Sequence, residues 1–291
     1  MKKLILLLAL AIICLHVSAQ QDSVKSNPDK DTIRIGGMVI VKKGKGNTDK
    51  GLSVKIGGEN GKKKGKRIST NWWIMDLGFA NYTDKTIYAN TGSYLVNRPG
   101  YPALDKYDFR LRTEKSINVN FWVFMQRVSL IKQHVFFKYG LGIELNNYRY
   151  KSAINYNEGG YVPYTANTQT NAPFIFRDSI SFSKNKLAAD YVTIPAMLNF
   201  VTNPESRKKG FSLSMGVSAG FLYNSRNKQI SNERGKLKNR GDYDLEKFKF
   251  SYVAELGLGP VLLYGSYSPK SMYQHSMNIR PYTIGFRFSY W

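Results

Sequence analysis

Six charged side chains stand out because the residues on either side of each are uncharged. They are Asp76, Lys138, Glu144, Lys249, Glu255 and Arg287. Each lies on the less apolar face of a segment whose residues alternate in polarity. Lone buried charges are costly, whereas three acids and three bases that face a common interior can neutralise one another. We therefore expect an internal polar network, which acts either as a plug or as a relay or gated conduit.

Histidine and serine toward the end of the chain offer a second kind of chemistry. The residues concerned are Ser271, Tyr273, His275 and Ser276, together with Asp242 and Asp244. A serine, a histidine and an aspartate can perform acyl transfer when they meet in space. No flanking motif supports that arrangement here, and His134, beside a short predicted turn, is expected to be an interfacial histidine. We predict no catalytic residue, no cofactor and no metal site, and keep a hydrolase or acyltransferase as an alternative.

The elements that hold these residues are predicted to be β-strands. Apolar residues recur at every second position, which is the period of a strand and not of a helix. Eight segments show this alternation, namely 73–80, 117–126, 135–146, 191–200, 211–221, 248–258, 261–267 and 282–290. In the second segment we place Phe121, Val123 and Met125 on the apolar face and Trp122 on the other. Because proline cannot donate a ladder hydrogen bond, we predict a β-bulge or an interrupted pairing at Pro195.

The connections between the eight segments alternate in length. Long connections lie near 81–111, 151–185, 224–246 and 268–280, and short ones near 129–133, 202–210 and 259–260. Outer-membrane barrels have long external loops and short periplasmic turns. We therefore predict an all-β fold: an eight-stranded antiparallel transmembrane β-barrel with a flexible N-terminal periplasmic segment. The interior of such a barrel is just wide enough for side chains, which favours a plug over a conduit.

A soluble barrel of the lipocalin type is the alternative fold, because alternation alone does not tell which face points outward. Three features favour the membrane barrel. The less apolar face is rich in small residues such as Ser214, Gly216 and Ser218, and it holds charges of both signs. Tyrosine and tryptophan also cluster near the segment ends, where their amphipathic rings suit a bilayer interface.

Composition and the start of the chain bear on where the protein acts. The 291 residues include 43 Lys and Arg against 20 Asp and Glu, a formal charge of +23, and they also include 20 Tyr, 16 Phe and 4 Trp. A basic start, an apolar run from Leu4 to Leu15 and small residues before Gln20 predict a cleaved signal peptide over 1–20. Cleavage would remove Cys14, the one cysteine. Export argues against the nucleic-acid partner that the basic charge would otherwise suggest.

After the signal peptide we predict two parts, a basic Gly- and Lys-rich periplasmic segment over 21–67 and an outer-membrane barrel over 68–291. The segment is too polar to bury a core, and it holds one strand-like piece from Thr32 to Val41. It contains a basic periplasmic patch of Lys62, Lys63, Lys64, Lys66 and Arg67. A second basic set, in the third long connection, is Arg226, Lys228, Arg234, Lys236, Lys238 and Arg240. We expect the patch to contact a periplasmic or envelope protein and the second set to contact lipopolysaccharide phosphates, with simple solvated charge as an equal alternative for both.

Four short motifs resemble one known family. Tyr191 to Leu198 is similar to the Tyr-x-x-Ile-Pro-x-x-Leu strand of Bacteroidetes outer-membrane β-barrel proteins of the PorT-like family. Leu263 to Ser268 and Thr283 to Phe288 resemble its last two strands, and Asp31 to Gly36 resembles mature N-terminal segments in the group. The resemblance covers about 72–291 and implies a barrel in the outer membrane of a Gram-negative organism, with no catalytic residue supplied.

We predict from these observations a non-enzymatic protein that anchors or binds partners in the cell envelope, surrounded by outer-membrane lipid and lipopolysaccharide. One member of the family is tied to the type IX secretion system, so the resemblance also implies an accessory role in protein secretion as a candidate. A narrow transport conduit and a barrel-rim hydrolase or acyltransferase are the alternatives.

Overall fold

The computed structural model describes residues 32–35, 38–42, 52–56, 67–204 and 210–289. The chain divides into two compact units, Met1–Lys64 and Gly65–Trp291, which we treat separately. The predicted signal peptide over 1–20, with Cys14, lies outside the described residues. In the described part of the chain, no helix is long and apolar enough to cross a membrane.

The first unit holds, in its described residues, one antiparallel sheet of three strands. These are β1 (Thr32–Ile35), β2 (Met38–Lys42) and β3 (Leu52–Ile56), with β2 in the centre. β1 and β2 fall within the strand-like piece that the sequence predicts. β3 corrects the expectation of a single piece, because the alternating residues Leu-Ser-Val-Lys-Ile also form a strand.

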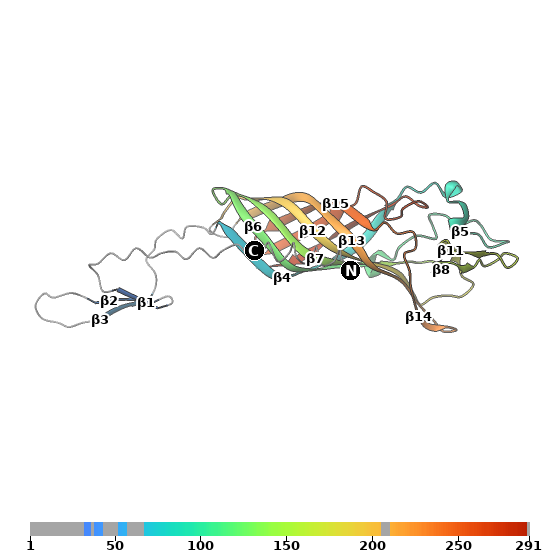
Figure 1. Ribbon diagram of the computed structural model, residues 1–291, viewed down its shortest axis with the longest axis horizontal. Helices are drawn as coiled ribbons and strands as arrows, with labels where there is room; N and C mark the ends of the chain where they lie inside the picture. Colours follow the sequence, from blue (N-terminus) through green and yellow to red (C-terminus); the bar gives the residue numbers. More distant parts are fainter. Residues whose placement is uncertain (1–31, 36–37, 43–51, 57–66, 205–209, 290–291) are drawn as a thin grey trace, which may run out of the picture. The chain divides into compact units, whose positions relative to one another are not determined.

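Eight strands among the described residues of the second unit close into a ring, in which each strand pairs antiparallel with both neighbours (Figure 1). In chain order they are β4 (Ile68–Asp84), β6 (Ile117–Ile131), β7 (Val135–Arg149), β12 (Lys184–Val201), β13 (Phe211–Ser231), β15 (Phe248–Leu258), β16 (Val261–Tyr267) and β17 (Ile279–Phe288). The pairing of β12 with β13 closes the ring. This confirms the predicted eight-stranded antiparallel barrel.

The two faces of the barrel differ as the alternation predicts. On β17, Ile284 and Phe286 are 59% and 55% exposed, whereas Arg287 is 7% exposed. Outward-facing apolar residues on the other strands include Met75, Leu77, Phe79, Phe121, Ile143, Leu198, Met215, Phe221, Phe250 and Leu258. An apolar exterior around a polar interior is the arrangement of a membrane barrel and the reverse of a lipocalin.

One strand departs from the predicted alternation at a β-bulge. The pairing of β6 with β7 shifts between Trp122 and Phe124, so that Val123 is the extra residue. Beyond the bulge the faces exchange, and Met125 is fully buried inside the barrel with Trp122. The predicted position of Met125 on the apolar exterior was wrong, because one extra residue changes the parity of a strand.

The ladder between β12 and β7 is interrupted at the proline. Thr193 pairs with Gly142 and Ala196 with Tyr139, but these two described strands form no pair at Ile194 and Pro195. On the other side of β12 the ladder with β13 is continuous through Pro195. The predicted interruption at Pro195 is therefore confirmed, and it lies on the β7 side.

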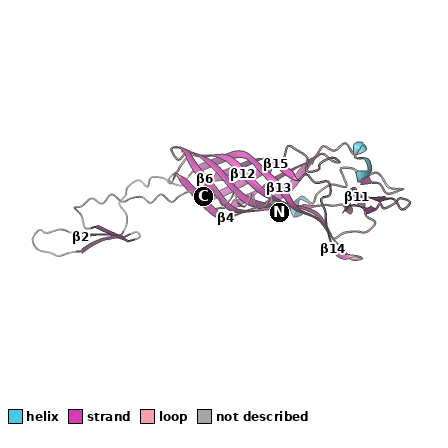
Figure 2. Cartoon of the chain, in the orientation of Figure 1, coloured by secondary structure: helices cyan, strands magenta, loops and turns pink. Residues whose placement is uncertain are grey.

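The long connections fold into a second layer at one end of the barrel (Figure 2). We call this layer the loop cap and define it as residues 85–116, 150–183, 232–247 and 268–278. Its elements are the 3-10 helices η1 (Tyr88–Asn90), η2 (Gly92–Tyr94) and η3 (Thr113–Lys115) and the strands β5 (Leu95–Val96), β8 (Ile154–Asn157), β9 (Gly160–Tyr161), β10 (Gln169–Thr170), β11 (Phe174–Arg177) and β14 (Gly235–Arg240). β11 lies between β5 and β8 in a small sheet, and β14 extends β13 as a hairpin.

A hydrophobic core holds the loop cap to the barrel end. It includes Tyr94, Phe109, Tyr156, Tyr243 and Leu245 from the cap, together with Leu187 and Ile279 from barrel strands. Four connections that are far apart in the sequence therefore pack around one apolar centre. The sequence analysis described these connections as long external loops and made no prediction of a core among them.

Candidate functional site inside the barrel

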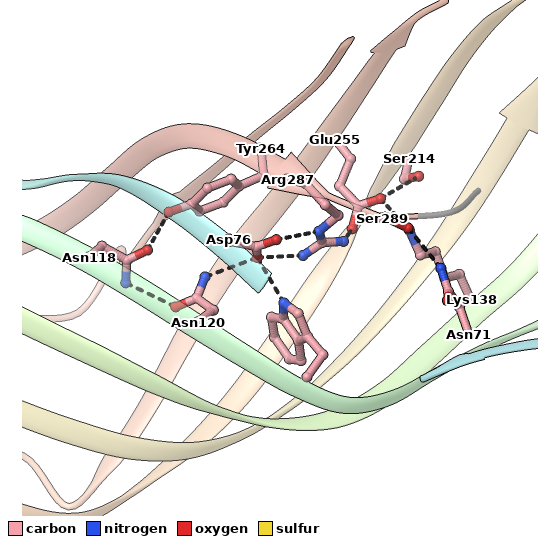
Figure 3. Close-up of polar contacts among 11 residues, drawn as sticks. Asn71, Asp76, Asn118, Asn120, Lys138, Ser214, Glu255, Tyr264, Arg287 and Ser289 are labelled. Carbon is pink, nitrogen blue, oxygen red and sulfur yellow. Dashed lines mark hydrogen bonds and ion pairs between the residues drawn. The ribbon is translucent and has the colours of Figure 1, made fainter. Parts of the chain in front are cut away.

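Arg287 and Asp76 form the centre of the charge network inside the barrel (Figure 3). The Arg287 Nε and Nη2 atoms each donate a hydrogen bond of 2.7 Å, to Oδ1 and Oδ2 of Asp76 respectively. The indole N–H of Trp122 also donates to Oδ2 of Asp76, at 2.7 Å, and the guanidinium lies 5.4 Å from the centre of the Trp122 ring. A forked pair with further donors on the carboxylate is the geometry that lets buried charges persist.

Glu255 joins this pair to a second cation. One oxygen of its carboxylate accepts from Arg287, and the other accepts from Lys138 and, at 3.2 Å, from the hydroxyl of Ser214. Both carboxylates and both cations are more than nine-tenths buried. The four side chains form one continuous ionic cluster across the interior, with no surplus charge.

A chain of amides links that cluster to the third ion pair. Asn120 donates to Asp76 at 3.1 Å, and Asn118 donates to both Asn120 and Asn146. Asn146 in turn donates to Glu144 at 3.0 Å. Glu144 accepts from Lys249, whose ammonium lies 5.2 Å from the centre of the Tyr191 ring. All six charged residues predicted from the sequence thus lie in one hydrogen-bonded network.

The strand register explains why these residues meet. Arg287 on β17 lies directly opposite Asp76 on β4, which lies opposite Asn120 on β6, and Asn120 lies opposite Glu144 on β7. Directly opposite residues on antiparallel strands share one face of the sheet. The inner face of the barrel therefore carries one row of interacting side chains from four consecutive strands of the ring.

Glycines make room for the large members of the network. A Cβ on Gly142 would lie 2.6 Å from Cε3 of Trp122, and a Cβ on Gly78 would lie 2.6 Å from the hydroxyl of Tyr264. The ring of Tyr264 crosses the space above Gly78 and its hydroxyl donates to Asn118. Small residues on the inner face are thus required by the bulk of the residues opposite them.

Two small cavities lie beside the network. A cavity of about 30 Å³ lies beside Trp122, Glu144 and Arg287, and one of about 90 Å³ lies near Lys138 and Asn199. A single water needs roughly 10–15 Å³ of such volume. The two cavities have room for a few waters each.

The sequence analysis missed several members of the network. Trp122 was placed on the less apolar face without being selected as a partner, Asn118 and Asn120 were not selected, and Tyr264 was given no face. The available signal was the alternating amides Asn118 and Asn120 and the amide of Asn146 two positions after Glu144, because buried carboxylates need donors. Of the basic periplasmic patch, Lys62, Lys63, Lys64 and Lys66 lie outside the described residues, and Arg67 is exposed at the start of β4.

Tyrosine hydroxyls connect the long connections within the loop cap. Tyr150 and Tyr156 are 2.6 Å apart at their hydroxyl oxygens, and Tyr156 and Tyr273 are 2.9 Å apart. Tyr94 donates to the backbone oxygen of Tyr243 at 2.8 Å. Burial raises the pKa of Tyr156 and Tyr273 well above the ordinary value and that of Tyr150 to about 12. These hydroxyls therefore remain neutral hydrogen-bonding groups at physiological pH.

Asp244 fastens two of the long connections through His275 and Ser276. Its carboxylate accepts from Nδ1 of His275 at 2.9 Å, from the hydroxyl of Ser276 at 2.7 Å and from both backbone N–H groups. Burial raises the pKa of Asp244, but the hydrogen bonds from His275 and Ser276 outweigh it and hold this pKa below its ordinary value. Because the serine hydroxyl bonds the aspartate and not the histidine, the geometry is that of a loop clasp and not of an acyl-transfer triad. His134 bonds the backbone oxygen of Val201 at the short-turn end.

A closed antiparallel barrel with an apolar exterior and paired charges inside defines a protein embedded in a membrane through β-strands. Comparison with known proteins agrees. A family model described as outer membrane protein beta-barrel domain matches residues 90–269. The chain belongs to this family, and it is an outer-membrane β-barrel protein.

Solved structures with some similarity include two mutants of the porin of Rh. blastica and a protein from work on the asymmetric conductivity of engineered proteins. They are 8–9% identical, the matches cover 77% of this chain and 100% of theirs, and the TM-scores are 0.17. At that score the likeness supports no inference about this chain. No curated protein matches it.

Proposed function

We propose that the protein is a sealed, non-enzymatic outer-membrane anchor that presents its loop cap outward and binds an envelope partner. The observation that supports this most is the continuous charge network, which runs across the barrel interior from Lys138 to Lys249. A barrel of eight strands has room for side chains but not for a wide channel. The two ends of the barrel are then the parts that can bind another protein.

The orientation is part of the proposal. Long connections are external and short turns periplasmic in bacterial barrels. On that rule the loop cap faces the outside, and the segment 21–67, which precedes the first barrel strand, lies in the periplasm. There it would bring the basic patch of Lys62 to Arg67 to a periplasmic or envelope protein, with protein secretion as one process that such a partner could serve.

Planar-bilayer recording of the purified full-length protein tests the sealed interior. We expect no large steady conductance from the wild type. The conductance of two variants is compared with that of the wild type. Arg287→Ala removes the central cation of the network. Arg280→Ala is the control on the same strand, β17, because Arg280 has no ion pair among the described residues. Steady open-channel current through the wild-type protein would overturn the anchor proposal and favour a narrow transport conduit.

The partner is tested by cross-linking in native membranes. A photoreactive residue in place of Lys64 would capture the periplasmic partner, and the same residue in place of Tyr101, in the loop cap, is the matched position at the other end. Recovery of one envelope protein from the first position and not from the second supports the proposed partner. The rim-enzyme alternative has weaker geometric support, because Asp244 already engages both His275 and Ser276.

A further inference from the structure

β13 continues well beyond the apolar exterior of the barrel. Its upper part pairs with β14 on one side and with β12 on the other, and β12 pairs with β7. Four strands thus form a ribbon that rises from the barrel end, and Figure 1 shows the β13–β14 hairpin projecting there. Side chains directly opposite each other in such a ribbon project from the same face.

Cations occupy the outer face of this ribbon in rows. In one row, Arg149 lies opposite Lys186, Lys186 opposite Lys228, and Lys228 opposite Lys238. In the next, Arg226 lies opposite Arg240, and in a third Ile230 lies between Lys184 and Lys236. We name these residues the cationic ribbon face: Arg149, Lys184, Lys186, Arg226, Lys228, Lys236, Lys238 and Arg240.

The alternating residues show that this face points away from the barrel interior. Asn185, Asn227 and Gln229 lie between the cations and are at most 3% exposed. Their amides bond one another and backbone groups on the inner side. The cations must then project from the opposite, outer side of each strand.

Acidic side chains do little to neutralise the face. Within the described residues, Arg226 with Asp190 is the ion pair that involves a member of the face. Arg234, which the sequence analysis grouped with this set, instead bonds Asp178 at 2.8 Å. Like charges directly opposite one another destabilise a pair of strands. The arrangement therefore favours a bound anion.

The neighbouring positive charges contribute to a lowered pKa at two lysines of the face. The neighbouring cations Lys184 and Lys236 lower the pKa of Lys228. Burial, followed by the charges of Lys184 and Arg226, lowers the pKa of Lys186 to about 8.

The height of the face along the barrel indicates which anion fits. The last large apolar side chains of β13 that are classed as exposed are Phe221 and Tyr223, and Arg226 follows three residues later, about 10 Å along the strand. Lipid head groups lie at that level, beside the apolar zone. Lysine and arginine bind phosphate through charge-assisted hydrogen bonds. We propose that the cationic ribbon face binds the phosphate groups of lipopolysaccharide packed beside the barrel, which rests on the outward orientation of the loop cap proposed above.

The test is binding of lipopolysaccharide to the purified full-length protein in non-ionic detergent, by displacement of a fluorescent lipopolysaccharide. The probe variant is Lys186→Gln/Lys228→Gln/Lys238→Gln, which neutralises one row. The matched control is Lys85→Gln/Lys106→Gln/Lys115→Gln, which removes the same charge from three exposed lysines of the first long connection. We expect about tenfold or greater loss of affinity in the row variant and none in the control.

Two further arms identify the source of the phosphate. Enzymatically dephosphorylated lipopolysaccharide is expected to bind more weakly than the intact form, and millimolar inorganic phosphate is expected not to displace it. Unchanged affinity of the row variant, equal binding of the dephosphorylated form, or full displacement by inorganic phosphate would each overturn the proposal. If the row variant does not fold, Lys236→Gln/Arg240→Gln on the outermost strand replaces it. The bilayer recording is independent of these results, so failure here leaves the sealed-anchor proposal to its own test.

Discussion

Arg287 on the last barrel strand lies directly opposite Asp76 on the first, and its guanidinium makes two hydrogen bonds of 2.7 Å to the two oxygens of that carboxylate. The same guanidinium bonds Glu255. One guanidinium therefore pairs with two buried carboxylates, and it links the first and last strands of the barrel. Arg287 is the cation of Asp76, and it shares Glu255 with Lys138.

Replacing Arg287 by glutamine is expected to destabilise the barrel by roughly 3–5 kcal/mol, the usual cost of leaving buried charges without their partner. Equilibrium unfolding in urea from lipid vesicles, followed by tryptophan fluorescence, measures this. Arg280→Gln is the control on the same strand, and it should change the free energy of unfolding by no more than about 0.5–1 kcal/mol. Equal stability of the two variants would contradict a structural role for the network.

Asp76→Asn combined with Arg287→Gln tests the coupling between the two residues. Each single change strands a buried charge, whereas the double change also removes the partner charge. We therefore expect the double variant to lose less free energy of unfolding than the sum of the single variants, by about 1–3 kcal/mol. Additive losses would mean that the pair does not interact energetically.

A methyl group at Gly142 is expected to cost about 1–3 kcal/mol, because its Cβ would lie 2.6 Å from the Trp122 ring and 2.6 Å from the backbone oxygen of Phe121. Gly265→Ala is the matched change, since the nearest atom to its Cβ is the backbone oxygen of Thr283 at 3.4 Å. The same unfolding measurement compares the two variants. A Gly142→Ala protein as stable as Gly265→Ala would show that the interior is looser than the distances indicate.

The loop cap is expected to lose stability in alkaline solution. Burial raises the pKa of Tyr150 and of Tyr243 to about 12, above the value near 10 of a free phenol. Because the folded pKa is the higher one, the contribution of each neutral phenol is complete below about pH 10 and is lost as the pH rises through about 12. Absorbance of tyrosinate near 295 nm, together with protease cleavage of the cap, follows this opening. Cleavage that is independent of pH from 9 to 12 would argue against it.

Loss of the Asp244 carboxylate is expected to release the last long connection. Because the folded pKa of Asp244 is lowered, its contribution is present above the ordinary aspartate pKa near 4 and disappears as the pH falls below that value. Asp244→Ala should therefore increase protease cleavage within 268–278 at neutral pH, and Asp242→Ala, whose partner Lys247 is exposed, should not. Equal cleavage of both variants would mean that the clasp does not hold the connection.

The barrel could be predicted from the sequence because its signals are local. Alternation with period two, the lengths of the connections and Pro195 each depend on neighbours along the chain. The six network charges could be selected for the same reason, since each interrupts an apolar strand. Their pairing followed only from the register, which places Asp76 opposite Arg287 across 211 residues of sequence.

Other features could not be predicted because they depend on distant partners. The bulge at Val123 is set by how β6 fits its neighbours. Residues 121–125 are all apolar, so the sequence gives no sign of the change in parity, and Met125 was assigned to the wrong face. The loop-cap core assembles tyrosines from four connections that individually resemble polar loops. The rows of the cationic ribbon face likewise appear only when β7, β12, β13 and β14 are aligned.

The position of Arg287 also has a consequence for biogenesis. It occurs in the final strand, so a nascent barrel that lacks β17 holds Asp76 and Glu255 without their shared cation. Asp76 then lacks its ion-pair partner, while Glu255 keeps Lys138. Pairing of β17 with β4 is the step that supplies the missing cation, so closure of this seam and neutralisation of the interior coincide.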